Sequence, residues 1–378
     1  MKLALVRQQY TPFGGAERFV DRALGALRDR GVDVTVIARR WKGNDGPPVL
    51  ECNPRHLGRT WRDAGFARCV QRIMAEGRFD LVQSHERIPG CHIYRAGDGV
   101  HATWLALRDR VRGAAAMLGT ALSPWHRYTL AAEAGVYRHP NLQAVICNSR
   151  MVRDDIARRF AVPADKLKVI YNGVDLDFFH PQLRTRYRAR TRSDLGITEQ
   201  TPVILFVGSG FERKGVPTLL HALTLMRRDD ATLLIVGQDK KLDRMRSLAS
   251  KLGLAHRVHF LGGRQDLRPF LGAADAFCLP TLYDPMPNAV LEALACGLPV
   301  ITSTTCGGAE LIRPGENGFV CDALDYEALA ENLDRLRGPN RPSPSVVRAS
   351  VEHLSLEAMA EQLSKLYGEL LADGALAQ

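Results

Sequence analysis

The chain has 378 residues, a length that predicts two domains at about 150 residues each. No apolar run approaches the roughly 20 residues that span a bilayer. Residues 1–190 contain 32 Lys and Arg against 18 Asp and Glu, whereas the remainder contains 19 against 23, so the net charge of +10 belongs to the N-terminal half. This asymmetry predicts an anionic partner, either a membrane or an acceptor molecule. Nucleic acid is disfavoured because no recognised binding module occurs.

Short apolar strands alternate with helical patterns along the chain. Strands are predicted at 3–6, 34–38, 80–83 and 144–147, with helices at 16–30 and 60–76 between them. The alternation restarts with strands at 202–207, 232–236, 257–261, 275–279 and 299–303. Such alternation is typical of βαβ units. The sequence therefore predicts an α/β protein with two successive doubly wound domains.

The domain boundaries follow from composition. Residues 181–200 are polar, charged and opened by a proline, so we predict an interdomain linker there, between domains at 1–180 and 201–354. The last stretch, 355–378, has a helical pattern over 355–371, and we expect it to pack back on the first domain.

The eight cysteines are scattered, with no CxxC pair and no His/Cys cluster. This spacing predicts neither a zinc site nor a disulfide framework, and it favours a reducing cytoplasm. The opening residues MKLALVRQQY predict a buried strand, because their apolar run is shorter than that of a secretion signal.

Two glycine-rich loops directly follow predicted strands. Gly14 and Gly15, within TPFGGAE, open a helix after the first strand, where the backbone can approach a phosphate closely, although a plain turn is the alternative. Residues 208–215, GSGFERKG, follow the first strand of the second domain and add Arg213 and Lys214. Cations beside a diphosphate stabilise the charge that develops on a departing nucleotide. Neither loop has the GxGxxG or GxxxxGK[ST] spacing of a dinucleotide site or a P-loop.

The stretch 283–306, YDPMPNAVLEALACGLPVITSTTC, carries two carboxylates eight residues apart. Asp284 lies in a proline-rich loop, and Glu292 lies in a helix predicted over 288–295. N–H groups at the start of such a helix favour phosphate oxygens, and a carboxylate can accept hydrogen bonds from a ribose diol. A solvated surface position for Glu292 is the alternative.

In this order, the three segments resemble a glycosyltransferase of the GT-B fold, and more narrowly the retaining glycosyltransferase family 4. Further matching segments are CNS (147–149), NGVD (172–175), VGQD (236–239) and LGGR (261–264). Within the family the chain is similar to the lipopolysaccharide core glucosyltransferase I subfamily, through YTPFGG, RIPGCHIYRAGD (87–98) and FERKGV. The resemblance implies two Rossmann-like domains facing each other across a cleft. It also implies transfer of a hexose, with glucose favoured, from a UDP-sugar to a lipopolysaccharide core or related lipid-linked glycan.

The resemblance also implies roles for individual residues. Asp98, Arg213, Lys214 and Asp284 would act in catalysis: Asp98, or His101 nearby, at the donor sugar, the two cations at the diphosphate, and Asp284 at the sugar. The residues implied to bind the donor are Gly14, Gly15, Glu17, Gly208, Arg264, Asn288, Ala289, Val290, Leu291 and Glu292. Asp284 replaces the first Glu of the family's EX7E motif and is one methylene shorter, which leaves the donor sugar open. Glu17 agrees with the GGxE form of the wider family and departs from the narrower subfamily.

The segment 101–140 mixes arginines with Trp104 and Trp125 and contains only two acidic residues. This mixture suits a helix on anionic lipid and predicts peripheral contact with the inner face of the cytoplasmic membrane, with ordinary solvated helices as the alternative.

The triplet Asp175-Leu176-Asp177 follows Asn172-Gly173, so we predict a turn or helix cap and no metal cofactor. Three other functions stay open: a non-catalytic nucleotide-sugar-binding scaffold, a family 4 enzyme with another donor, and, disfavoured by its missing motif, a nicotinamide dehydrogenase.

Overall fold

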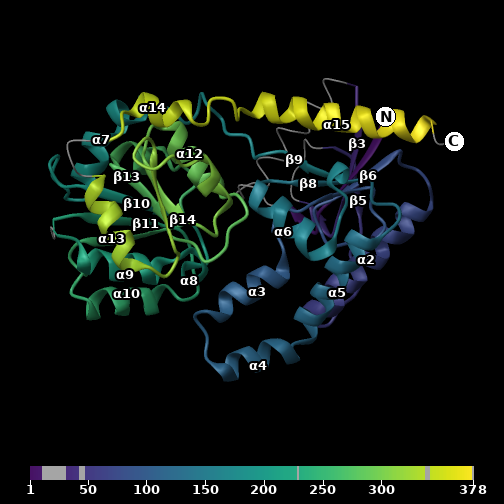
Figure 1. Ribbon diagram of the computed structural model, residues 1–378, viewed down its shortest axis with the longest axis horizontal. Helices are drawn as coiled ribbons and strands as arrows, with labels where there is room; N and C mark the ends of the chain where they lie inside the picture. The colour runs from purple at the N-terminus through teal and green to yellow at the C-terminus, as the bar shows by residue number, and fades with distance from the viewer. Residues whose placement is uncertain (11–30, 42–46, 228–229, 337–340, 377–378) are drawn as a thin grey trace. The chain divides into compact units, whose positions relative to one another are not determined.

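The computed structural model describes residues 1–10, 31–41, 47–227, 230–336 and 341–376. The chain divides into two compact units (Figure 1). The first consists of residues 1–173 together with 356–378, and the second of residues 174–355. The first unit therefore ends at Gly173 instead of at residue 180, and the chain returns to it at Leu356.

The first unit is built on a parallel sheet in the order β5-β3-β1-β6-β7-β8-β9. Its strands are β1 (Lys2–Val6), β3 (Asp33–Ala38), β5 (Val49–Glu51), β6 (Leu81–Ser84), β7 (Ile93–Arg95), β8 (Ala144–Cys147) and β9 (Leu167–Val169); β2 (Gln9–Tyr10) and β4 (Arg40–Trp41) form a separate short pair. The four predicted strands are confirmed to within one residue at each end. The short strands β5, β7 and β9 were not predicted. The helix predicted at 16–30 lies outside the described residues.

Helices cover both faces of this sheet. One face packs on α2 (Gly58–Ala75), α5 (Pro124–Arg138) and α6 (Arg150–Phe160) through apolar residues such as Phe66, Val136 and Ile156. The other face packs on α15 (Leu356–Leu376), whose Leu363 and Tyr367 are buried against strand residues, and Figure 1 shows this last helix lying along the unit that contains the N-terminus. The helices α3 (His101–Asp109) and α4 (Ala114–Leu122) extend away from the sheet.

The second unit has a parallel sheet in the order β12-β11-β10-β13-β14-β15. Its strands are β10 (Val203–Val207), β11 (Thr232–Val236), β12 (Val258–Gly262), β13 (Ala276–Leu279), β14 (Val300–Ser303) and β15 (Gly318–Cys321). Its helices are α7 (Leu183–Asp194), α8 (Phe211–Lys214), α9 (Val216–Leu225), α10 (Leu242–Lys251), α11 (Arg268–Ala273), α12 (Asn288–Ala295), α13 (Tyr326–Arg335) and α14 (Pro344–Ala349), with 3-10 turns at Gly307–Leu311 here and Ala164–Lys166 in the first unit. Both units thus have the Rossmann-like α/β architecture that was predicted.

The predicted linker at 181–200 is wrong for most of its length. Residues 183–194 form α7, which belongs to the second unit and packs against α11. Arginine favours helices and its long stem covers apolar surface, so a highly charged segment can still be an integral helix. The polar composition of residues 181–200 is shared by linkers and by charged helices, so composition alone did not distinguish them.

One disulfide was not expected. Cys52, directly after β5, is bonded to Cys69 on α2, with Cα atoms 6.0 Å apart. The strand-to-helix connection brings the two residues together, although they are 17 positions apart and form no recognisable motif. The cysteine spacing therefore no longer supports a reducing compartment.

Among the described residues, no helix combines the length and the apolar character needed to cross a membrane.

Candidate active site

The second unit's strand order reverses between β10 and β13. In open parallel sheets, ligands bind outside the carboxyl ends of the strands at such a reversal. The loops that follow these two strands are residues 208–215 and 280–288, which contain most of the candidates that the sequence indicated. The strand order and the sequence motifs therefore indicate the same two segments as the candidate ligand-binding site.

The loop after β10 is shaped by its glycines. Gly215 has a φ of +86°, and a Cβ there would lie 1.9 Å from the carbonyl oxygen of Pro280, so only glycine permits this approach of the two loops. A Cβ at Gly208 would lie 3.2 Å from Cδ of Lys214. Gly208 thus leaves room for the stem of the lysine that the sequence placed at the diphosphate.

Lys214 and Asp284 form the closest pair of candidate groups. The Lys214 Nζ lies 2.5 Å from Oδ2 of Asp284, and both side chains are largely buried, at 13% and 10% exposed. Arg213 is half-exposed and donates from Nη1 to the Tyr283 carbonyl at 2.9 Å and to Asp284 Oδ2 at 3.5 Å. The two cations and the carboxylate, 70 positions apart in sequence, therefore form one cluster.

Backbone hydrogen bonds position this cluster independently of the carboxylate. The Leu282 N–H donates to the Arg213 carbonyl at 2.8 Å, which joins the two loops. The Asp284 N–H donates to the Thr305 carbonyl at 3.2 Å, and the Gly307 N–H donates to the Asp284 carbonyl at 2.8 Å. The conformation around Asp284 is thus held by its main chain and does not depend on its carboxylate.

The other donor-site candidates of this unit lie at the same edge of the sheet. Glu292 is 7% exposed, one turn into α12, with Val290 and Leu291 also buried and Asn288 and Ala289 half-buried at the helix start. Its burial argues against the alternative of a solvated surface residue. Arg264 is exposed in the loop after β12, with its guanidinium 5.9 Å from the ring centre of Phe270.

In the first unit, Gly14, Gly15 and Glu17 lie outside the described residues. Asp98 is exposed in the loop after β7. His101 begins α3, is 6% exposed, and its Nε2 lies 3.0 Å from Nδ1 of His126. Burial, reinforced by nearby arginine charges, lowers the pKa of His101 to about 3, so its imidazole is neutral at pH 7. Of the two alternatives at this position, only Asp98 is exposed to solvent.

A buried ion pair fixes the loop that carries Asp98. Glu133 is fully buried and accepts from Nε of Arg87 at 2.9 Å and from the His101 N–H at 2.9 Å. Arg87 also donates to the Gly99 carbonyl at 3.0 Å. The charge pair therefore holds Gly99 and His101, which follow Asp98 in the chain.

The structure adds Glu86, which the motif analysis did not single out. It follows β6, and the first sheet's strand order reverses between β1 and β6, so Glu86 occupies this unit's own ligand-binding position. Its Oε1 accepts from the Gln8 N–H at 3.0 Å, and burial raises the pKa of Glu86 to about 7. A carboxyl group directly after a predicted buried strand is the signal that identifies such a residue.

The acidic triplet at 175–177 forms a turn, as predicted. The Asp175 carboxylate accepts from the N–H groups of Asp177 at 3.2 Å and Phe178 at 3.0 Å. Within the described ranges, no group of three or more His, Cys, Asp or Glu is arranged to hold a metal ion.

Comparison with known proteins gives matches along nearly the whole chain. Residues 13–178 match the family model described as Glycosyltransferase Family 4, and residues 188–338 match Glycosyl transferases group 1. The lipopolysaccharide glucosyltransferase WaaG of Escherichia coli K12 is 28% identical over 88% of both chains. The lipopolysaccharide core biosynthesis glycosyltransferase LpsE of Rhizobium meliloti is 28% identical over 95% of this chain and 96% of its own.

Solved structures agree with these matches. The crystal structure of WaaG, a glycosyltransferase involved in lipopolysaccharide biosynthesis, superimposes with a TM-score of 0.82 and 26% identity, over 96% of this chain and 99% of its own. HepE of Anabaena, solved in complex with UDP-glucose, has the same fold, with a TM-score of 0.73 at 20% identity over 98% of this chain and all of its own.

Proposed function

We propose a specific reaction for this chain, which belongs to glycosyltransferase family 4 and has the two Rossmann-like domains of the GT-B fold. It transfers a hexose, with glucose favoured, from a UDP-sugar to a lipopolysaccharide core or related lipid-linked glycan, and the anomeric configuration is retained. The observation that carries the proposal is the cluster of Lys214, Arg213 and Asp284 at the strand reversal of the second unit. The names of WaaG and LpsE support the class of acceptor.

In the proposed reaction, the bond between the anomeric carbon and the β-phosphate oxygen breaks first. Lys214 and Arg213 stabilise the negative charge that develops on the departing diphosphate. The acceptor hydroxyl oxygen then bonds to the anomeric carbon from the same face, and its proton passes to the departing phosphate oxygen. Asp284 orients the sugar, and Glu292 holds the ribose hydroxyls. No protein carboxylate becomes covalently bound to the sugar in this scheme.

The direct test is release of the nucleoside diphosphate by the purified protein from a panel of UDP-, GDP- and ADP-sugars, with and without a lipopolysaccharide core acceptor. UDP-glucose is the first donor to examine, because HepE of the same fold was solved with it. We expect acceptor-dependent release of UDP. Saturable binding without any turnover would favour the scaffold function, and turnover with a GDP- or ADP-sugar alone would favour a different donor.

Asp284→Ala is expected to abolish most sugar transfer while leaving the binding of UDP almost unchanged. The main-chain hydrogen bonds of residue 284 survive the substitution, and Lys214 loses the carboxylate that competes with a phosphate for its ammonium group. Calorimetry with UDP and a donor panel measures both properties. Asp284→Glu restores the family's usual reach, so it should keep activity or change the preference among epimeric sugars. Loss of UDP binding as severe as the loss of transfer would mean that Asp284 maintains the loop instead.

Contact with anionic membrane is the second part of the proposal, and it involves α4 and the loop before it. Of the described residues, Val111, Met117, Leu118 and Leu122 are large apolar side chains with 43–68% of their surface exposed. Arg110 and Arg112 are exposed beside them. Arg108 is buried and donates to Thr120, so this arginine of the segment does not contribute to the exposed surface. The first unit contains 29 Lys and Arg residues and 20 Asp and Glu residues, whereas the second unit contains 22 and 21. The positive charge is therefore concentrated in the first unit.

We expect the protein to co-sediment with anionic vesicles more strongly than with neutral ones, and less so as salt increases, because each basic residue near the surface contributes about 1 kcal/mol. Replacing Leu118 and Leu122 by serine should weaken this binding. Leu225→Ser, at an exposed leucine of the second unit, is the matched control and should leave it unchanged. Equal binding to anionic and neutral vesicles would contradict the proposed membrane contact. Equal losses of vesicle binding in the Leu118/Leu122 variant and in Leu225→Ser would contradict it as well.

A further inference from the structure

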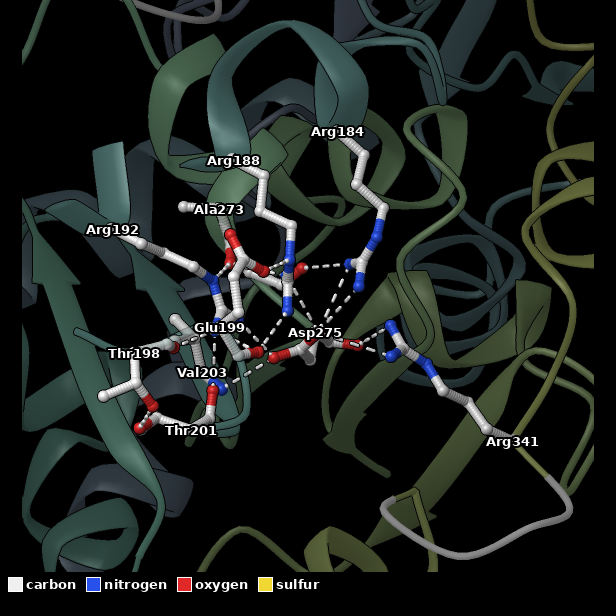
Figure 2. A network of polar contacts seen from close by, with 11 residues as sticks. Arg184, Arg188, Arg192, Thr198, Glu199, Thr201, Val203, Ala273, Asp275 and Arg341 are labelled. Atoms are coloured by element: carbon white, nitrogen blue, oxygen red, sulfur yellow. Dashed lines mark hydrogen bonds and ion pairs between the residues drawn. The ribbon is translucent and has the colours of Figure 1, made fainter. Parts of the chain in front are cut away.

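The arginines of α7 form a polar network that the proposed reaction does not use. Arg184, Arg188 and Arg192 are spaced four residues apart, so they lie on one face of the helix. Together with Arg341 they surround the carboxylate of Asp275, which immediately precedes β13 (Figure 2). With Glu199 as the other acid of the network, the four guanidinium groups exceed the carboxylates by two charges.

Two of the four arginines are fully engaged in the fold. Arg192 is 1% exposed and donates to Asp275 Oδ2 at 2.6 Å and to main-chain carbonyls that include those of Ala273 and Thr201. Arg188 donates to Asp275 Oδ1 at 3.0 Å and to Glu199 Oε2 at 2.8 Å. These bonds attach α7 to the amino edge of the sheet.

Arg184 and Arg341 are the more exposed of the four, at 41% and 32%. Arg184 donates from Nη1 to the Ala274 carbonyl and to Asp275 Oδ1, both at 3.2 Å, and Arg341 donates from Nη2 to the Asp275 carbonyl at 2.6 Å and from Nη1 to Asp275 Oδ1 at 3.4 Å. A carboxylate offers about four lone-pair positions, and Asp275 also accepts from Arg188, Arg192 and the Val203 N–H. Asp275 is therefore saturated, and each of these two arginines keeps N–H groups with no partner among the described residues.

The same two arginines line a hollow of about 290 Å³. Its other walls are mainly apolar and include Leu183, Leu271, Leu298, Pro342 and Pro344, with the hydroxyl-bearing Ser343 at one side. An apolar pocket with a few converging polar groups is the usual form of a small-molecule site, and this volume is at the lower end of the range. Guanidinium groups match phosphate and carboxylate oxygens in geometry as well as charge.

We propose that this hollow binds a small organic anion, a phosphate or carboxylate on a compact apolar body, through Arg184 and Arg341. The site is separate from the proposed donor site, because Asp275 precedes β13 at the amino end of the strand whereas Asp284 follows its carboxyl end. The inference does not depend on the sugar or acceptor that the protein uses.

The test uses phenyl phosphate and benzoate as anionic probes and phenol as their neutral counterpart, with binding to the full-length protein measured by calorimetry. We expect saturable binding of the anions but not of phenol, and the tighter of the two anions identifies the preferred head group. Arg184→Gln and Arg341→Gln should each weaken the binding by about tenfold or more, since each removes a charged hydrogen-bonding partner. Arg184→Lys keeps the charge but loses the planar fork, so its affinity should be intermediate.

Two controls separate this site from other sources of binding. Arg190→Gln removes the same charge from the same helix, but its side chain is 87% exposed and lies near Asp194, so affinity should stay unchanged. Lys214→Ala should also bind the anions normally, because it alters only the donor site. The absence of saturable binding to the wild type at millimolar concentrations would overturn the proposal. Equal losses in Arg190→Gln, or loss in Lys214→Ala, would do so as well.

Discussion

Lys214→Ala is expected to lower kcat by about 100-fold or more, with little change in the melting temperature. The lysine ammonium lies 2.5 Å from Asp284 Oδ2, within the cluster that we propose holds the diphosphate, where its charge would stabilise the negative charge that develops on the leaving group. Removing one such preorganised electrostatic contact costs about 2.7–4 kcal/mol in comparable sites. Steady-state kinetics with the nucleotide sugar and acceptor measures the effect.

The effect should fall on kcat more than on KM, because the charge that Lys214 stabilises develops mainly in the transition state. Lys214→Arg preserves the charge in a different geometry, and we expect partial activity. Lys251→Ala, at an exposed position at the end of α10, is the matched control for loss of one positive charge. A kcat for Lys214→Ala close to that of Lys251→Ala would refute the assignment of Lys214 to the diphosphate.

Asp275→Asn is expected to destabilise the second unit by about 3–5 kcal/mol, because it leaves four clustered guanidinium groups without their shared countercharge. For a unit of this size, a loss of 1 kcal/mol lowers the melting temperature by about 2–4 °C. Scanning calorimetry should therefore show a clearly earlier transition. The control is Asp194→Asn, which alters an exposed acid at the end of α7 whose carboxylate is 3.9 Å from Arg190. It should change the free energy of unfolding by less than about 1 kcal/mol.

The contribution of Asp275 also depends on pH. Burial by itself would raise the pKa of Asp275, but the Val203 N–H and the surrounding arginines outweigh burial and lower it. A carboxyl group with a lowered pKa in the folded state stabilises the protein above its unfolded pKa of about 4, and the contribution is lost as the pH falls below that value. The difference between wild type and Asp275→Asn should therefore shrink in acid. A difference that is the same at pH 7 and at pH 3 would contradict this account.

The fold class and the second unit's donor-site loops were predictable from local pattern. Buried parallel strands are continuous apolar runs bounded by turn residues, so the nine predicted strands followed from short apolar runs in the sequence. Lys214 was identified in a loop directly after such a strand, and Asp284 was identified in a proline-rich loop, eight residues before Glu292. Parallel strands place all such loops at one edge, and the two residues meet there.

Long-range packing decided what the sequence pattern could not show. The short strands β5, β7 and β9 have too few residues for a periodicity, and the Cys52–Cys69 bond depends on how α2 lies on the sheet. The segment 181–200 has the composition of a linker, and only its packing shows that it is an integral helix.

By itself, then, the sequence determined two parallel α/β units and the two loops that contain the candidate donor-site residues, because the residues that form each strand or loop are neighbours in the sequence. Only the tertiary structure decided which side chains meet across the chain. Lys214 pairs with Asp284 from 70 positions away, and the arginines of α7 converge with Arg341 on Asp275. Glu86 became a candidate only when the strand order placed it at the reversal of the first sheet. Hydrogen bonds and ion pairs of this kind depend on strand order and helix packing, which no local pattern specifies.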